Sequence, residues 1–263
     1  MNELIISYRV EFKKIKNSFA IWLVVLGAAF IPFFFLLNII YQWKDYLPHA
    51  GVNPWNEYFR KGFNGVHFFF LPLLIVLLIA LLLNIEHKSN TWKHIFVLPI
   101  SKTKIFFSKY LILISLILMF YTLMLIFFLS GGLLLSLWKS EFNFLIFKPT
   151  YFYHSVESGI ASFMIKSFIS VLGLMAIHFW LSFRLKNLFL NIGIGLAGAV
   201  IAVSMFIGHW ESIIYLPYAS PLLMCNFIPD AHRYLSDFLI NSLICFVIIF
   251  ILSYIDFTRI FKG

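Results

Sequence analysis

Six long uncharged segments alternate with short charged ones along the chain. With His counted as neutral, they are 17–43, 62–85, 110–138, 167–183, 187–210 and 238–255. A helix needs roughly 20 residues to cross about 30 Å of hydrocarbon, and each segment reaches that length once flanking residues are included. The segments are continuously apolar, whereas the strands of membrane barrels alternate polar and apolar residues. The pattern therefore predicts an all-α polytopic membrane protein with six transmembrane helices.

The amino-acid composition excludes several other classes of protein. Hydrophobic residues make up 62% of the 263 residues and charged residues 12%, against about 45–50% and about 25% in soluble domains. This excludes a soluble enzyme, a coiled-coil fibre, a disordered chain and a disulfide scaffold. No internal repeat, linker or soluble domain is visible, so we expect a single transmembrane domain over residues 1–263.

A seventh uncharged segment, 212–229, is interrupted by Pro217, Pro221 and Pro229. Each proline removes a helix N–H donor. Broken backbone persists at membrane depth only where protein or water covers it. We therefore predict a re-entrant or outer segment over 211–236, between spans five and six. A true seventh span is the alternative.

Positive charge is distributed unequally between the two sides that six spans define. One side holds both termini and thirteen of the twenty Lys and Arg residues. Such an excess marks the cytoplasmic side, so we expect a multi-pass protein of the bacterial inner membrane with both termini in the cytoplasm. The formal net charge of +9 then reflects topology and contact with anionic membrane lipids, and it does not indicate nucleic-acid binding.

The first eighteen residues have the pattern of a basic amphipathic helix. Apolar residues such as Phe12 recur at helical spacing, and the cations Arg9 and Lys13 lie beside them. Such a helix is suited to lie along the inner leaflet. A solvated leader into the first span is the alternative.

The loop 86–109 carries the densest charge on the chain, mixed with the large apolar residues Trp92 and Phe96. Asn90 can cap a short helix and Pro99 would end it. Trp92 and Phe96 would then share one helix face. A short element of this kind is suited to lie against the bilayer or to dock into a groove on a cytoplasmic partner.

The order of residues in this loop resembles the first cytoplasmic loop of type-2 ABC exporter permeases. The pattern is Glu86-x-x-x-Asn90-x-Trp92-Lys93, then Leu98-Pro99-x-Ser101-Lys102, then Lys109. The branch that it resembles is the small six-span permeases of lantibiotic-immunity and bacitracin-type systems. The likeness in layout covers the whole chain, whereas the likeness in motif is confined to 86–109.

The resemblance implies roles for three parts of the chain. Segment 86–109 would be the coupling loop that contacts a separate ATPase subunit, segment 1–18 a connecting helix, and 211–236 the re-entrant segment. The coupling residues would be Glu86, Lys88, Asn90, Trp92, Lys93, Phe96, Pro99 and Lys102; the connecting helix would use Arg9, Phe12 and Lys13; the re-entrant segment would contain Pro217, Pro221 and Pro229. Glu86 would pair with a cation of the N-terminal segment, such as Arg9 or Lys13. Two permease subunits, identical or related, would assemble with two ATPases.

The residues themselves agree with a motor on another chain. No G-x-x-x-x-G-K-[S/T] motif for phosphate binding is present, so ATP and Mg²⁺ are expected on the partner ATPase and no cofactor on this chain. The eight His residues are scattered and H-E-x-x-H is absent, so we predict no metal site and no catalytic residue.

These features predict the permease subunit of an ATP-driven exporter. Because the apolar runs lack the carboxylates that ion-coupled pumps keep at mid-membrane, the expected substrate is hydrophobic or amphipathic, such as a peptide antibiotic or a lipid, moved out of the membrane or cell. The alternative is a non-transporting accessory or sensory membrane protein that docks a cytoplasmic partner. An intramembrane enzyme is disfavoured, because the spans contain no polar cluster.

Two features of the spans suggest internal packing. Small residues four apart in the fifth span, such as Gly195 and Ala199, let helices approach closely, either within the bundle or against a second subunit. His178 lies inside the fourth span, where a hydrogen bond to a neighbouring helix is the simpler reading and a relay role the alternative.

Overall fold

The computed structural model describes residues 2–16, 18–49, 51–88, 91–97, 100–149, 159–225 and 235–261. Most of these residues are helical, and there is no strand among them. Six of the described helices are long and apolar enough to cross a membrane. The predicted all-α, six-span class is therefore confirmed.

The helices follow one another with short connections. They are α1 (Asn2–Lys16), α2 (Phe19–Tyr41), α3 (Pro54–Gly65), α4 (Leu71–Lys88), α5 (Trp92–Val97), α6 (Lys102–Trp138), α7 (Ile160–Arg184), α8 (Leu188–Ile207), α9 (Ser220–Cys225) and α10 (Leu235–Ile255). Single π-helical turns join α3 to α4 (η2, Val66–Phe70) and follow α10 (η6, Asp256–Ile260). Short 3₁₀ turns are η1 (Trp43–Tyr46), η3 (Ser140–Phe142) and η4 (Glu211–Tyr215).

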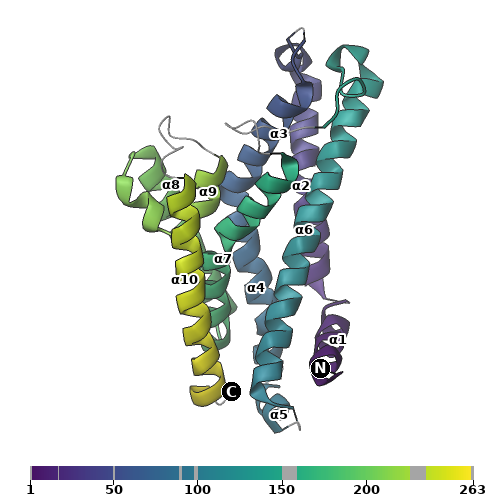
Figure 1. Ribbon diagram of the computed structural model, residues 1–263. Coiled ribbons are helices and arrows are strands. Elements are labelled where there is room, and N and C mark those ends of the chain that lie inside the picture. Colours follow the sequence, from purple (N-terminus) through teal and green to yellow (C-terminus); the bar gives the residue numbers. More distant parts are fainter. Residues whose placement is uncertain are drawn as a thin grey trace.

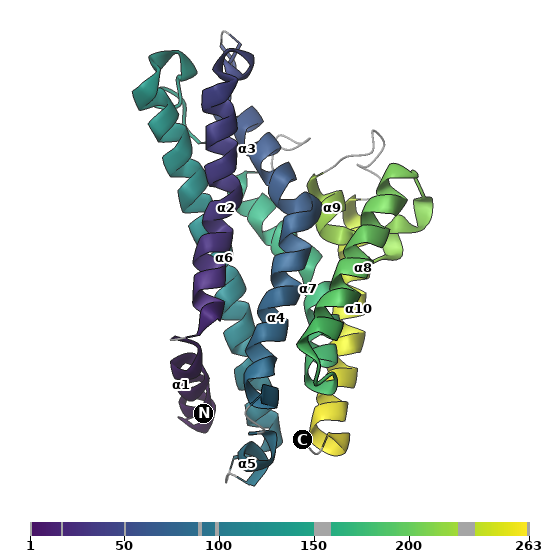
Figure 2. The same ribbon diagram turned by 180° about the vertical axis from the view of Figure 1, so that it is seen from behind.

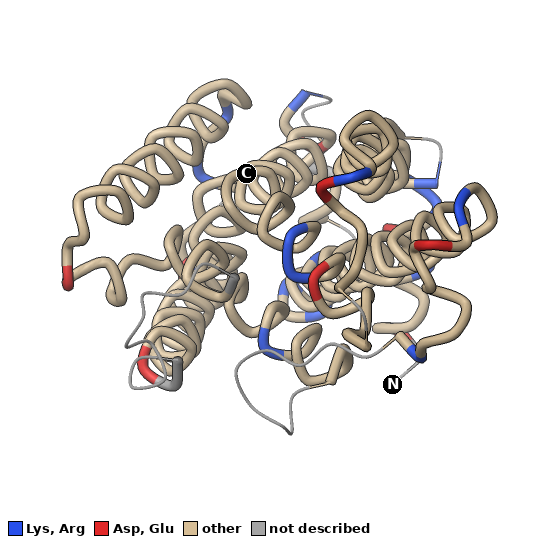
Figure 3. Tube along the Cα trace, turned by 90° about the horizontal axis from the view of Figure 1, so that it is seen from above, with Lys and Arg blue, Asp and Glu red and all other residues tan. Residues whose placement is uncertain are grey.

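The spans form an elongated bundle with α4 near its centre (Figures 1 and 2). Helix α2 packs on α6, α10 packs on α7, and α4 contacts both α7 and α8. Helices α1 and α5 and both termini lie at one end of the bundle, and α3 lies toward the other end (Figure 1). Viewed along the bundle, charged residues are few and most of the chain is uncharged (Figure 3).

The second span is longer than its uncharged run of 62–85 predicts, because α3, η2 and α4 form one helical segment from Pro54 to Lys88. The Asn53 side chain caps it by accepting a hydrogen bond from the Trp55 N–H at 3.0 Å. The charged residues near its start pair with one another, since Arg60 contacts the Glu57 carboxylate at 2.6 Å. Ion pairs one turn apart on an exposed helix face do not end a helix.

The loop predicted over 86–109 is likewise shorter in the structure. Its first residues end α4, and its last residues begin α6, where the Ser101 side chain accepts a hydrogen bond from the Lys104 N–H at 3.4 Å. Between them lie α5 and short connections. Helix α6 has 37 residues, or about 55 Å, so it extends beyond a hydrocarbon core of about 30 Å.

Segment 211–225 contains only the turn η4 and the six-residue helix α9. Neither is long enough to cross a bilayer, so a seventh span is not formed by the described part of this segment. Pro217 lies between the two elements and Pro221 is the second residue of α9. Pro229 lies outside the described residues, and the re-entrant hairpin stays a prediction.

The polar groups of α7 form hydrogen bonds between helices. His178 contacts the Asn191 side chain at 2.9 Å and the Tyr218 hydroxyl at 2.8 Å. A second buried histidine, His67 in η2, contacts the Ser167 hydroxyl at 2.5 Å. These contacts agree with the simpler reading of His178, since polar side chains in lipid associate helices.

The small residues of α8 pack within the bundle. A methyl group added at Gly195 would lie 2.4 Å from a Val76 methyl on α4, whereas nothing lies within 4 Å of the same position on Gly193. Replacing Gly195 by alanine is therefore expected to lower the free energy of unfolding by about 1–3 kcal/mol. The β-branched Val76 side chain has few alternative rotamers with which to yield.

The matched control is Gly193→Ala, which lies two residues away on the exposed face of the same helix. It is expected to be neutral or to gain up to about 1 kcal/mol from the better helix propensity of alanine. Unfolding of the purified protein in detergent, followed by tryptophan fluorescence, measures both. Equal losses at the two positions would contradict the packing of α8 on α4.

Candidate functional site

Helix α1 lies beside the first turns of α6 at the end of the bundle that carries both termini (Figure 1). Its buried face includes Ser7, whose hydroxyl donates to the Ser108 hydroxyl at 2.9 Å. The Tyr8 and Ser115 hydroxyls lie 3.0 Å apart. The opposite face is exposed and mixes apolar side chains with cations. The amphipathic pattern of residues 1–18 therefore corresponds to a helix docked on α6.

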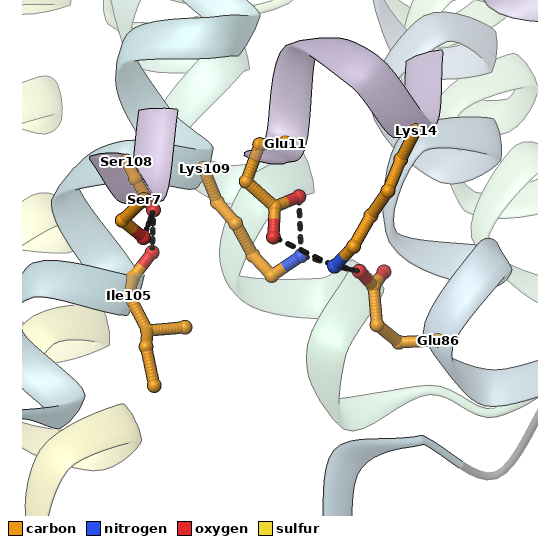
Figure 4. A network of polar contacts seen from close by, with 7 residues as sticks. All are labelled: Ser7, Glu11, Lys14, Glu86, Ile105, Ser108 and Lys109. Carbon is orange, nitrogen blue, oxygen red and sulfur yellow. Dashed lines mark hydrogen bonds and ion pairs between the residues drawn. The ribbon is translucent and has the colours of Figure 1, made fainter. Parts of the chain in front are cut away.

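Four charged side chains meet where α1, α4 and α6 come together (Figure 4). The Lys109 ammonium lies 2.6 Å from the Glu86 carboxylate and 3.0 Å from that of Glu11. Lys14 approaches the same two carboxylates, at 3.2 Å and 2.9 Å. Lys109, Glu86 and Glu11 are each less than 10% exposed. We call Glu11, Lys14, Glu86 and Lys109 the ion cluster.

The pKa values of Glu11 and Lys14, the two members of the ion cluster on α1, follow from these contacts. Burial alone would raise the pKa of Glu11, but the ammonium groups of Lys109 and Lys14 outweigh it and hold that pKa below 4.5. Burial would lower the pKa of Lys14, but Glu11 and Glu86 raise it above its usual value. The cluster therefore brings two basic and two acidic side chains together, and their formal charges balance.

Glu86 pairs with a cation of the N-terminal segment, as expected, but that cation is Lys14 and not Arg9 or Lys13. Its carboxylate pairs with Lys14 and Lys109, whereas Arg9 and Lys13 are exposed. The helix geometry explains the difference, because Lys14 lies one turn after the buried Glu11, on the face of α1 that meets α6. Arg9 and Lys13 lie on the opposite face.

Trp92, the first residue of α5, is surrounded by aromatic rings. Ring centroids of His87, Phe96, Phe257 and Phe261 lie 5.7, 5.9, 5.8 and 5.3 Å from that of Trp92. The indole is 3% exposed. Helix α5 is therefore held against the C-terminal turn η6, which supplies Phe257. We call Trp92 and these four rings the aromatic cluster.

Two lysines connect the aromatic cluster to α6. The Lys109 ammonium lies 5.3 Å from the Trp92 ring centroid, so one side chain contacts both clusters. Lys102 donates a hydrogen bond to the Phe261 carbonyl at 2.9 Å and lies 4.5 Å from the Phe96 ring. The end of α4, the start of α6, α5 and the C-terminal turn therefore form one connected unit.

A further ion pair extends this unit to α7. Arg184, at the end of α7, pairs with Asp256 in η6. The Trp180 indole also donates to Asp256, at 2.8 Å. Together with the hydrogen bond from His87 to the Ser182 carbonyl at 2.9 Å, these contacts join α4, α7 and the C-terminal turn at the same end of the molecule.

The predicted coupling residues divide into three groups. Glu86, Trp92, Phe96 and Lys102 lie in the connected unit. Lys88 is exposed at the end of α4, where it lines a groove toward α2. Asn90 and Pro99, with the side chain of Lys93, lie outside the described residues.

Trp92 and Phe96 share a face, as predicted, but that face packs inward rather than toward a partner. Among the described side chains of α5, Val97 is the most exposed, at 85%. Of the predicted connecting-helix residues, Arg9, Phe12 and Lys13 all lie on the exposed face of α1. Their side chains are therefore available to lipid or to a partner.

Sequence reasoning did not single out Glu11, Lys14, Phe257 and Phe261 for the site, and it did not predict Lys109 as a buried side chain. A signal for two of them was present, because Glu11 and Lys14 are an acid and a base three residues apart beside apolar positions. Among the described residues, no group of three or more His, Cys, Asp or Glu side chains is placed to hold a metal ion.

The fold and this site define a multi-pass membrane protein with a docked amphipathic helix and a short helix between spans at the same end. A model of the family described as ABC-2 family transporter protein matches residues 8–195. The chain belongs to this family, and it is a membrane permease of an ABC transporter. No curated protein and no solved structure was found to match the chain.

Proposed function

We propose that this permease is driven by a separate ATPase that contacts α5 at the cytoplasmic end of the bundle. One observation carries the proposal: Val97 is 85% exposed on a short helix whose Trp92 and Phe96 rings pack on the C-terminal turn. A short helix can dock into a groove on a partner through exposed apolar side chains. ATP and Mg²⁺ would be bound by that partner.

The connected unit supplies a route for force. A displacement of α5 is passed to α4 and α6 through Glu86 and Lys109, and to the C-terminal turn through Trp92. Packed side chains and ion pairs transmit displacement because close-packed interiors are stiff. Movement of α5 would therefore tilt several spans together, which is what alternating access between the two sides requires.

The assembly proposed is two permease chains, identical or related, with two ATPases. Both termini and α5 lie at one end (Figure 1), and the sequence places the excess of Lys and Arg on that side. This supports a cytoplasmic position for both termini in a bacterial inner membrane. The exposed faces of α8 and α10 would face lipid or the second permease.

The proposed cargo is a hydrophobic or amphipathic molecule that leaves toward the outer side. The described acidic residues of the spans lie near helix ends, as Glu57, Glu86 and Asp256 do. Ion-coupled pumps keep such residues at mid-membrane. A peptide antibiotic or a lipid suits an apolar path better than a sugar or a free ion, and the loop likeness to lantibiotic-immunity and bacitracin-type permeases favours the peptide.

The test is a charge at the tip of α5. Val97→Glu is expected to weaken retention of the ATPase on the purified permease by about 30-fold or more, the loss typical of an interface hot spot of about 2 kcal/mol. Co-purification of a candidate ABC ATPase with the permease, followed by ATP hydrolysis of the complex, measures this.

The matched control is Val52→Glu, since Val52 is also exposed but lies between α2 and α3, toward the opposite end of the bundle. It should leave ATPase retention unchanged. Retention that is equal in both variants would remove α5 as the contact. A complex that forms but in which the permease never changes ATP hydrolysis would favour an accessory or sensory role.

A further inference from the structure

A groove of about 450 Å³ opens between the first turn of α2 and the last turns of α4. It is lined by Ser18, Phe19, Ala20, Leu81, Asn84, Ile85 and Lys88. Its walls are mainly apolar, while Asn84 and Lys88 supply an amide and an ammonium group one helical turn apart. The groove lies next to the ion cluster in sequence and space, because Glu86 falls between its lining residues.

Two polar side chains of this groove, Asn84 and Lys88, have no polar partner among the described residues. Lys88 takes part in none of the ion pairs between described residues, and the Asn84 side chain in none of their hydrogen bonds. Ser18 differs, since its hydroxyl donates to the Ile15 carbonyl at 2.8 Å and caps α2. One cation and one hydrogen-bonding amide are therefore available to a ligand.

The surroundings favour an anion. The nearest acids, Glu11 and Glu86, are neutralised within the ion cluster. The exposed face of α1 adds Arg9, Lys13 and Lys16, none of which pairs with an acid among the described residues. The field at the mouth of the groove is therefore positive, and an anionic group gains from it.

The groove lies at the start of α2, which we expect to be at the depth of the lipid headgroups. Phe19 and Trp22 are each 63% exposed at the start of the span, and exposed aromatic residues gather at membrane interfaces. An ammonium at this depth meets phosphates, while the apolar walls below it meet acyl chains. A soluble phosphate compound would gain nothing from those walls.

We propose that this groove is a binding site for an anionic phospholipid. The phosphate contacts the Lys88 ammonium and the Asn84 amide, and an acyl chain lies along Phe19, Leu81 and Ile85. The bound lipid joins the start of α2 to the end of α4 beside Glu86, and so braces the helix that carries the ion cluster. The site depends on the chain lying in a bilayer and not on the ATPase.

The test is lipid binding to the full-length protein in detergent, measured by native mass spectrometry with phosphatidylglycerol and phosphatidylcholine of the same acyl chains. The first phosphatidylglycerol should bind more tightly than the first phosphatidylcholine. Lys88→Gln should weaken phosphatidylglycerol binding about fivefold, the equivalent of about 1 kcal/mol for one interfacial cation, and leave phosphatidylcholine binding unchanged. Lys88→Arg should preserve the preference.

The matched control is Lys186→Gln, which removes an exposed cation from the hairpin between α7 and α8. It should retain the wild-type preference. Equal affinity for the two lipids in the wild type, or equal losses in Lys88→Gln and Lys186→Gln, would overturn the site. Displacement of the lipid by millimolar inorganic phosphate would show a phosphate site rather than a lipid site. None of these outcomes bears on ATPase docking at Val97.

Discussion

Replacing Lys109 by methionine is expected to lower the free energy of unfolding by about 3–5 kcal/mol, because it leaves two buried carboxylates short of a cation. Glu86 and Glu11 both contact this ammonium, and Lys109 itself is 1% exposed. Lys14 alone would then face two acids. We expect α1 to detach from α6 first, since the cluster is a main polar contact between them.

Unfolding in detergent micelles and protease cleavage between α1 and α2 measure these two effects. The matched control is Lys104→Met, which removes another α6 lysine that pairs with an α1 carboxylate, Glu3. That pair is exposed, and exposed pairs contribute about 0–1 kcal/mol. Similar small losses in both variants would contradict a buried ion cluster.

A double variant separates charge from packing. Adding Glu86→Leu to Lys109→Met removes one of the two carboxylates that Lys14 alone would face, so part of the lost stability should return. Glu11 keeps Lys14 as its partner in this variant. No recovery would show that the Lys109 side chain acts mainly by filling space.

Replacing Trp92 by alanine is expected to lower the free energy of unfolding by about 3–5 kcal/mol, the usual loss for a buried tryptophan. It should also uncouple ATP hydrolysis from transport, because α5 loses the ring that joins it to Phe257 and Phe261. ATP hydrolysis by the reconstituted complex and export of a candidate peptide or lipid are the two measurements.

The control for this variant is Trp22→Ala, since Trp22 is 63% exposed on α2. It should change stability by less than about 1 kcal/mol and leave coupling intact. Transport that persists in Trp92→Ala with hydrolysis unchanged would remove the aromatic cluster from the coupling route. Loss of both activities without any loss of stability would instead place Trp92 at the ATPase contact.

The ion cluster and the aromatic cluster hold different ends of the chain in place. The ion cluster fixes the N-terminal helix to the loop end of α4, while the aromatic cluster fixes the C-terminal turn to α5. Lys109 contacts both. We therefore expect a movement of α5 to displace both termini, and α7 through Asp256 and Arg184, as well as the two spans that flank it.

The sequence by itself determined the six spans, the amphipathic first helix and the short helix around Trp92. Each follows from local signals, since an apolar run needs no distant partner to predict a span and a helical repeat defines its own faces. The predicted ends of the second span were less accurate. The prediction ended the span at the first charged residues, whereas Glu57 and Arg60 pair with each other inside the helix.

Only the tertiary structure decided which cations neutralise Glu86 and which way Trp92 faces. Lys14 and Glu86 are 72 residues apart, and Lys109 and Glu11 are 98 apart. Contacts at such separations depend on how helices dock, because several lysines near the membrane surface offer the same charge. Packing of α1 on α6 and of the C-terminal turn on α5 buries Lys109 beside Glu86 and leaves cations such as Arg9 and Lys13 exposed.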